Sequence, residues 1–373
     1  MTPDEVRTAL REYLGSRPGV EVARRLRDGD AELVAAGFDI ARWHELVRDV
    51  GVASLAASEE RGGLGLGLGH VIAAVEEAGA VLLPGPLKAT VLLAWLDAQL
   101  APASRSLGQD LDRIMAGEGV AGLAGWVEPS DARPDLDLRD GAVTGTVNDV
   151  SHGATASTLV TIARSGGRTV PVVVHLDAEG VDITRTAQRT VDLTTPMGTL
   201  ELDGVPATEL RLPEGGDAAA WVQAAVWVLD AAEQVGGVQG CVRDATDYAK
   251  VRVQFDQPIG SYQAIQHRCA DMVADLASAR AMVTVAATYV EQRDSRAEAC
   301  AALARAEASD AFNRAADALI QIHGGIGFTW EHDAHLYFRR ARATGAASGS
   351  AARLRSYAVR RGATSLLVDA VQA

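Results

Sequence analysis

The chain has 373 residues, 48% of them hydrophobic, and a formal net charge of −14 at pH 7. This length allows two or three domains with separate cores. No run of eighteen apolar residues predicts a membrane span, no signal-peptide pattern opens the sequence, and the excess of acid argues against general nucleic-acid binding, which requires a cationic face. We therefore expect a cytoplasmic protein that neither crosses a membrane nor binds nucleic acid.

Residues 1–118 predict an N-terminal helical domain. The opening Thr2-Pro3-Asp4-Glu5 matches a capping box with proline at the first helical position. The glycine-rich GGLGLGLGH superficially resembles a dinucleotide-binding loop. No strand precedes it and no acidic residue follows at the required spacing, so we interpret it as a loop before a helix.

Residues 119–213 predict a central β domain. Short segments rich in Val, Thr and Ile alternate with Gly and Asp, as in GAVTGTVNDVSHG, STLVTIA, TVPVVVHLD and GTLELDGV. No helical segment interrupts them, which favours an antiparallel barrel or sandwich over a parallel sheet.

Residues 214–373 predict a C-terminal four-helix bundle. Helical periodicity runs over residues 218–250, 261–292, 295–322 and roughly 346–371. The whole chain is thus expected to be an α+β protein in which a helical domain, a β domain and a bundle follow one another.

Two segments of the bundle have the most specific composition. In YAKVRVQFDQPIGSYQ, the guanidinium of Arg252 offers a forked donor that suits a phosphate, although a helical hairpin with an exposed charge is the simpler alternative. In QIHGGIGFTWEHD, Gly324 and Gly325 permit close approach of the backbone to an anionic ligand, and Gln321 can bond an adenine or a phosphate. The nearby histidines lack the spacing of metal ligands, and we expect no metal site.

At this separation, and after helices and a β domain, the two segments resemble the acyl-CoA dehydrogenase family of flavoproteins over essentially the whole chain. The resemblance implies α,β-dehydrogenation of an acyl-CoA thioester, FAD as cofactor at a subunit interface, and an electron-transfer flavoprotein or similar acceptor. It also implies that the bundle makes dimers and tetramers.

The same resemblance implies roles for individual residues. Arg252 is similar to the family's arginine that binds the FAD pyrophosphate across the dimer, and Phe255 to its companion against the cofactor. Gln321, Gly324 and Gly325 are similar to the residues that hold the ADP half of a neighbour's FAD.

The family's catalytic base is not evident. Many members carry it as a Glu in a Glu-Gly-Thr segment, and the matching position, 27 residues after Gln321, is Ser348 in Ser348-Gly349-Ser350. A serine without a basic partner cannot remove an α proton. Ser350 keeps the hydroxyl of the segment and is a further expected cofactor contact.

Other members place the Glu on the first helix of the bundle, where ungapped counting gives Val226, with Asp230 and Glu233 one and nearly two turns later. These two carboxylates are the alternative candidates for the base. Two segments of the β domain, GWVEPSDARPD and GTVNDVSHGAT, also depart from the family's flavin contacts. The family's contacts to the flavin ring are therefore largely missing from this sequence, whereas its ADP-side residues are present.

The leading hypothesis is a subunit without a base in a heteromeric α2β2 acyl-CoA dehydrogenase, paired with a paralogous chain and acting on bulky or sterol side-chain CoA thioesters. A homotetramer with Asp230 or Glu233 as base, a flavin oxidase or monooxygenase on the same fold, and a structural partner without cofactor are the alternatives.

Overall fold

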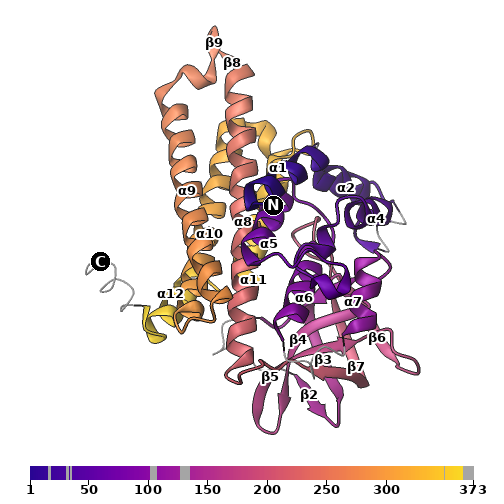
Figure 1. Ribbon diagram of the computed structural model, residues 1–373. Helices are drawn as coiled ribbons and strands as arrows, with labels where there is room; N and C mark the ends of the chain where they lie inside the picture. Colours follow the sequence, from indigo (N-terminus) through magenta and orange to yellow (C-terminus); the bar gives the residue numbers. More distant parts are fainter. Residues whose placement is uncertain are drawn as a thin grey trace.

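The computed structural model describes residues 1–15, 18–30, 33, 36–100, 107–126, 135–347 and 349–363. Helices occupy the first part of the chain, a β domain the middle, and long antiparallel helices the last part (Figure 1). The predicted α+β order is thus confirmed. One apolar core runs from the N-terminal helices into the bundle, and a second core lies inside the β domain.

The N-terminal helices pack against the side of the bundle (Figure 1). The predicted capping box is present, since Thr2 Oγ1 accepts from the Glu5 amide at 3.3 Å and Glu5 Oε2 accepts from the Thr2 amide at 2.6 Å. The α-helices of this part are α1 (Pro3–Leu14), α2 (Pro18–Arg27), α4 (Ile40–Arg48), α5 (Leu68–Ala80), α6 (Leu87–Gln99) and α7 (Gly108–Met115).

The β domain is a closed barrel, because β4, β2, β3, β7 and β5 pair in a ring in which β5 returns to β4. The pairings are antiparallel, as predicted, except that β4 runs parallel to β1 and, through one residue pair, to β2. Alternate apolar side chains such as Leu159, Val174 and Leu200 fill the interior. The strands are β1 (Ala121–Leu123), β2 (Leu136–Arg139), β3 (Ala142–Ser151), β4 (Thr158–Ser165), β5 (Arg168–His175), β6 (Ile183–Gln188) and β7 (Met197–Glu209).

The bundle is built from α8 (Ala218–Val251), α9 (Gln263–Glu291), α10 (Ala297–His323), α11 (Ala334–Ala347) and α12 (Ala351–Arg360). The single helix predicted over residues 346–371 is wrong. Gly349 has a φ of 96°, which an α-helix cannot contain, and Ser350 then caps a new helix. The chain therefore breaks at the segment where the family resemblance places the base.

Helices α5 and α8 cross at very short range because each presents glycine at the contact. A Cβ on Gly79 would lie 2.1 Å from the carbonyl oxygen of Glu233, and one on Gly236 would lie 2.0 Å from that of Glu76. This approach ties the N-terminal helices to the longest helix of the bundle.

Among the described helices, α9 is long and apolar enough to cross a membrane by length and composition alone. It packs against both α8 and α10 on the outer side of the bundle, yet only 28% of its most apolar stretch is buried within the chain. A bundle helix that packs along two others is expected to be this long, so its length and apolar composition are weak evidence for a membrane span. Its exposed side carries the charged Arg268 and Asp271 together with small uncharged side chains, among them Ala270, Val273, Ala274, Ala277, Ala281 and Val285.

Candidate cofactor and substrate site

The two motifs predicted in the bundle meet at one end of it. Helices α8 and α10 run in the same direction and end side by side, where the rings of Tyr248 and His323 stack with centroids 4.0 Å apart. The chain then turns through the small hairpin of β8 (Val253–Gln254) and β9 (Gln257–Pro258), which projects beyond the bundle (Figure 1).

Arg252 and Phe255 project from this end into solvent. The guanidinium of Arg252 is exposed and has no hydrogen-bond or ion-pair partner in the part of the chain that the structure describes. Phe255 lies at the hairpin turn with a φ of 52° and is 89% exposed. An unpaired cation and an uncovered aromatic ring at this turn are available to a ligand or a second chain.

Gln321, Gly324 and Gly325 lie at the same end. Gln321 is exposed, Gly324 has a φ of 66°, and a Cβ at either glycine would meet nothing within 4 Å. Open backbone next to a free guanidinium matches the donor set that a pyrophosphate requires. These residues therefore remain the candidates for holding the ADP half of FAD. Ser350 lies elsewhere, where its Oγ accepts from the Arg353 amide at 3.4 Å as the cap of α12.

The histidines beside the glycine turn are structural. His323 is buried, its Nδ1 lies 2.8 Å from the Leu319 carbonyl oxygen, and its ring contacts that of His332 with centroids 4.0 Å apart. No group of three or more potential metal ligands occurs among the described residues.

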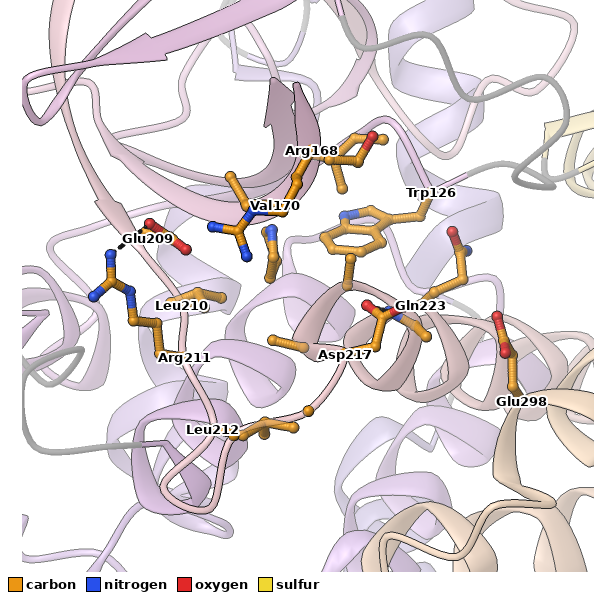
Figure 2. Close-up of a pocket in the computed structure, with 18 of the residues that line it drawn as sticks. Trp126, Arg168, Val170, Glu209, Leu210, Arg211, Leu212, Asp217, Gln223 and Glu298 are labelled. Atoms are coloured by element: carbon orange, nitrogen blue, oxygen red, sulfur yellow. Dashed lines mark hydrogen bonds and ion pairs between the residues drawn. The ribbon is translucent and has the colours of Figure 1, made fainter. Parts of the chain in front are cut away.

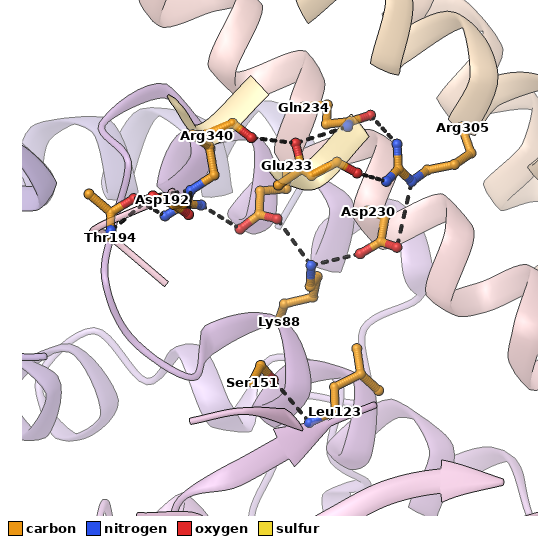
Figure 3. A network of polar contacts seen from close by, with 11 residues as sticks. Lys88, Leu123, Ser151, Asp192, Thr194, Asp230, Glu233, Gln234, Arg305 and Arg340 are labelled. Carbon is orange, nitrogen blue, oxygen red and sulfur yellow. Dashed lines mark hydrogen bonds and ion pairs between the residues drawn. The ribbon is translucent and has the colours of Figure 1, made fainter. Parts of the chain in front are cut away.

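The two alternative bases, Asp230 and Glu233, belong to an ion-pair network in the interior (Figure 3). Lys88 Nζ on α6 contacts Asp230 Oδ1 at 2.6 Å and Glu233 Oε2 at 3.0 Å. Arg305 Nε on α10 lies 3.6 Å from Asp230 Oδ2, and Arg340 Nη1 on α11 lies 3.0 Å from Glu233 Oε1. The network thus joins four helices around the two carboxylates.

Arg340 extends this network to the β domain. Its Nε contacts Asp192 Oδ2 at 2.6 Å, and Asp192 in turn accepts from both the amide and the hydroxyl of Thr194. Arg340 and Asp192 are almost fully buried. The network contains three cations and three carboxylates, so its net charge is zero. This balance allows so many charged side chains to be buried together.

The network is poorly suited to proton abstraction. Burial favours the neutral form of Glu233, but Lys88 and Arg340 outweigh it and hold the pKa of Glu233 below its usual range. Burial likewise opposes the charge of Lys88, yet Asp230 and Glu233 outweigh it and raise the pKa of Lys88. A carboxylate held ionised by two cations is a weaker base than a free one. Ser348, the other position implied for the base, lies outside the described residues.

His152 lies close to the network, in the segment expected to cover the flavin. Its side chain is 4% exposed, its ring packs edge-on against Phe38, and its buried Nδ1 has no partner among the described residues. Burial, mainly, lowers the pKa of His152 to about 3.

This shift predicts acid sensitivity. Below its ordinary pKa of 6.5, His152 binds a proton in the unfolded chain but not in the folded one, so the stability that it confers is lost as the pH falls toward 3. Between pH 7 and 5.5 this loss amounts to about 1 kcal/mol in the free energy of unfolding. Urea denaturation should show the loss in the wild type and in the exposed control His267→Gln, and a flatter profile in His152→Gln. Equal profiles would contradict the assignment.

A cavity of about 960 Å³ opens at the opposite end of α8 (Figure 2). The start of β5, the end of β7 and the N-terminus of α8 line it, together with Trp126, Glu298 and Arg361. Its size is that of a pocket for a large organic ligand. No motif in the sequence predicts this cavity; its one local signal is Gln223, a lone amide in the apolar run AAAWVQAAVWVL.

Comparisons with known proteins decide the family. Residues 228–363 match the family model for the acyl-CoA dehydrogenase C-terminal domain. The acyl-CoA dehydrogenase IpdE2 of Mycobacterium tuberculosis is 35% identical over 348 residues, covering 91% of this chain and 92% of that protein. The chain belongs to the acyl-CoA dehydrogenase family.

Solved structures of acyl-CoA dehydrogenases agree with the fold. A chain of the ChsE4–ChsE5 complex from M. tuberculosis superposes with a TM-score of 0.81 at 27% identity, covering 98% of this chain and 97% of that one. A variant of the Tcur3481–Tcur3483 steroid ACAD superposes with a TM-score of 0.81 at 25% identity, covering 97% of this chain and 100% of that one. The expected helical domain, β domain and bundle are therefore those of an acyl-CoA dehydrogenase.

Proposed function

We propose that this acyl-CoA dehydrogenase chain is the subunit without a catalytic base in a heteromeric enzyme, in which it contributes the ADP-side contacts to FAD held mainly by a paralogous subunit. The observation that carries the proposal is the separation of two features within one chain. Arg252 and Gln223 are 29 residues apart on or beside α8, or ~43 Å at 1.5 Å per residue. One dinucleotide cannot reach from the free ADP-side residues to the cavity of the same chain.

In this proposal bound FAD would accept the hydride, as in the family generally. Arg252 would bind its pyrophosphate, the open backbone at Gly324 and Gly325 would accommodate the ADP half, and Gln321 would orient it. Asp230 and Glu233 keep the interior together instead of removing the α proton, because Lys88, Arg305 and Arg340 already hold them. The proton acceptor then belongs to the paralogous subunit.

The surface supports a partner of this kind. Large apolar side chains gather at the ADP-side end of the bundle, where Val251 is 74%, Phe255 89% and Phe328 69% exposed. The small exposed side chains of α9, such as Ala274, Ala277 and Ala281, would allow another helix to approach closely. Two structural relatives are described as two-component assemblies, the ChsE4–ChsE5 complex and the Tcur3481–Tcur3483 steroid ACAD.

The description of the second of these relatives as a steroid ACAD supports our proposal that the substrates are bulky, steroid-derived CoA thioesters. We further propose that an electron-transfer flavoprotein or similar acceptor reoxidises the flavin. We also propose that the protein is cytoplasmic.

Co-expression tests it. Purified alone, the chain should carry little flavin and turn over acyl-CoA at least about 10²–10⁴-fold more slowly than a base-containing enzyme. Co-expressed with a paralogue that carries Glu at a base position, it should yield a complex with flavin absorbance and activity toward an artificial electron acceptor. In that complex Arg252→Ala should lower the flavin content, whereas Arg48→Ala, an exposed change on α4, should not. Full flavin loading and turnover by the chain alone would refute the proposal in favour of a homomeric enzyme.

A further inference from the structure

His332 joins the glycine turn to the start of α11. Its Nδ1 lies 3.1 Å from the backbone nitrogen of Ala334, the first residue of that helix. A backbone N–H can only donate, so Nδ1 is the acceptor and carries no proton. The imidazole thereby pairs with one of the backbone donors that have no partner inside the helix. His332 can do this only while its ring is neutral.

The ring of His332 also contacts the residue that precedes the glycine turn. Its centroid lies 4.0 Å from that of His323, and the centroid of His323 lies 4.0 Å from that of Tyr248 on α8. His323 Nδ1 donates to the Leu319 carbonyl oxygen at 2.8 Å. His323 is the last residue of α10, and Gly324 follows it with a positive φ. The stacked rings therefore connect the end of α10, the glycine turn and the start of α11.

Protonation of His332 opposes this arrangement. An imidazolium carries a proton on both nitrogens, so Nδ1 no longer accepts from Ala334. The new positive charge stands at the N-terminus of α11, where the helix dipole disfavours cations. A proton on His323 as well would set two like charges in rings whose centroids are 4.0 Å apart. Acid therefore favours release of the His332 ring from its position.

The charged groups nearby do not reverse this preference. The titratable and charged side chains around the start of α11 come from its own loop and from α2, α8, α10 and α11, and are Arg24, Tyr248, His323, Glu331, Asp333, His335 and Arg339. The two carboxylates favour a proton on His332. Arg24 contacts Asp333 at 2.6 Å and balances its charge, and Glu331 is exposed, so water screens it.

We infer that His332 is a pH-sensitive latch, which holds the glycine turn to α11 while its ring is neutral and releases both when the ring is protonated. An ordinary imidazole is mostly neutral at pH 7.5 and mostly protonated at pH 5.5. The link to the cofactor rests on the proposed function, in which Gly324 and Gly325 of this turn accommodate the ADP half of FAD. Acid should then loosen the ADP side of the cofactor site.

Hydrogen exchange of the full-length chain, read by mass spectrometry, tests the latch without the cofactor. After correction for the intrinsic exchange rate, protection at the start of α11 should fall about 5-fold between pH 7.5 and 5.5, as for the loss of one helix cap. His332→Asn keeps an oxygen that can accept from Ala334 at either pH, so protection there should stay constant. His332→Ala has no acceptor and should show the lower protection at both pH values.

Two comparisons assign the effect to His332. His267→Asn makes the same substitution at an exposed position of α9 and should retain the pH dependence of the wild type. His332→Asn still contains the buried His152, so a loss of pH dependence in that variant cannot come from His152. The inference is overturned by constant protection in the wild type, by acid sensitivity of His332→Asn equal to that of the wild type, or by full protection of His332→Ala at pH 7.5.

The co-expressed complex tests the consequence for the cofactor. On dialysis at pH 5.5, the complex with wild-type chain should lose flavin about 5-fold faster than the complex with His332→Asn, whereas the two should retain it equally at pH 7.5. Equal loss at pH 5.5 would overturn the link between the latch and the cofactor. Absence of flavin from both complexes at pH 7.5 would instead count against the proposed function and leave the exchange result standing.

Discussion

Replacing Arg340 with methionine should lower the free energy of unfolding by about 3–5 kcal/mol. Arg340 is 2% exposed, and its guanidinium contacts Asp192 at 2.6 Å and Glu233 at 3.0 Å. Methionine fills a similar volume but leaves two carboxylates without their shared cation, and Asp192 is itself only 4% exposed. Burying an unpaired charge is among the largest penalties that one substitution can impose.

The matched control lies two residues later on the same helix. Arg342 contacts Asp317 at 2.9 Å, but both side chains are about half exposed, so water replaces the lost partner. Arg342→Met should change the free energy of unfolding by about 1 kcal/mol or less. Urea denaturation of both variants measures the contrast. Similar losses would show that the network around Arg340 is not a buried charge cluster.

Replacing Gly236 with alanine should also be strongly destabilising, by about 1–3 kcal/mol or more. The new Cβ would lie 2.0 Å from the backbone carbonyl oxygen of Glu76, so α5 and α8 must separate. Separation would loosen the apolar contact between them and weaken the seam between the N-terminal helices and the bundle.

Gly69 is the control for this change. It lies in α5, and its Cβ would meet no atom closer than 3.9 Å. Gly69→Ala should therefore stabilise the chain by about 0.5–1 kcal/mol, because alanine is the better helix former. Denaturation midpoints that shift in opposite directions support the close crossing. A neutral Gly236→Ala would mean that the two helices do not meet there.

The structure also changes how the two candidate carboxylates are understood. From the sequence, Asp230 and Glu233 are acidic residues near the family's second base position. In the fold, each is held by two cations, and one of these, Lys88, lies 142 residues from Asp230 in the chain. Their proximity to the expected base position is therefore better explained by an interior that needs balanced charge than by proton abstraction.

The sequence by itself determined what depends on local patterns. The capping box at Thr2, the change from a period of two to helical periodicity, and the two bundle motifs were readable because the residues concerned are neighbours in the chain. The motifs around Arg252 and Gln321 were enough to indicate the acyl-CoA dehydrogenase family, and they predict where the ADP side of its cofactor binds.

Only the tertiary structure decided what depends on distant residues. It placed Tyr248 against His323, gave Asp230 and Glu233 their cations, ended a helix at Ala347, and opened a cavity at the start of α8. Burial and electrostatic pairing are set by segments that meet in space, and no local pattern fixes which segments those are.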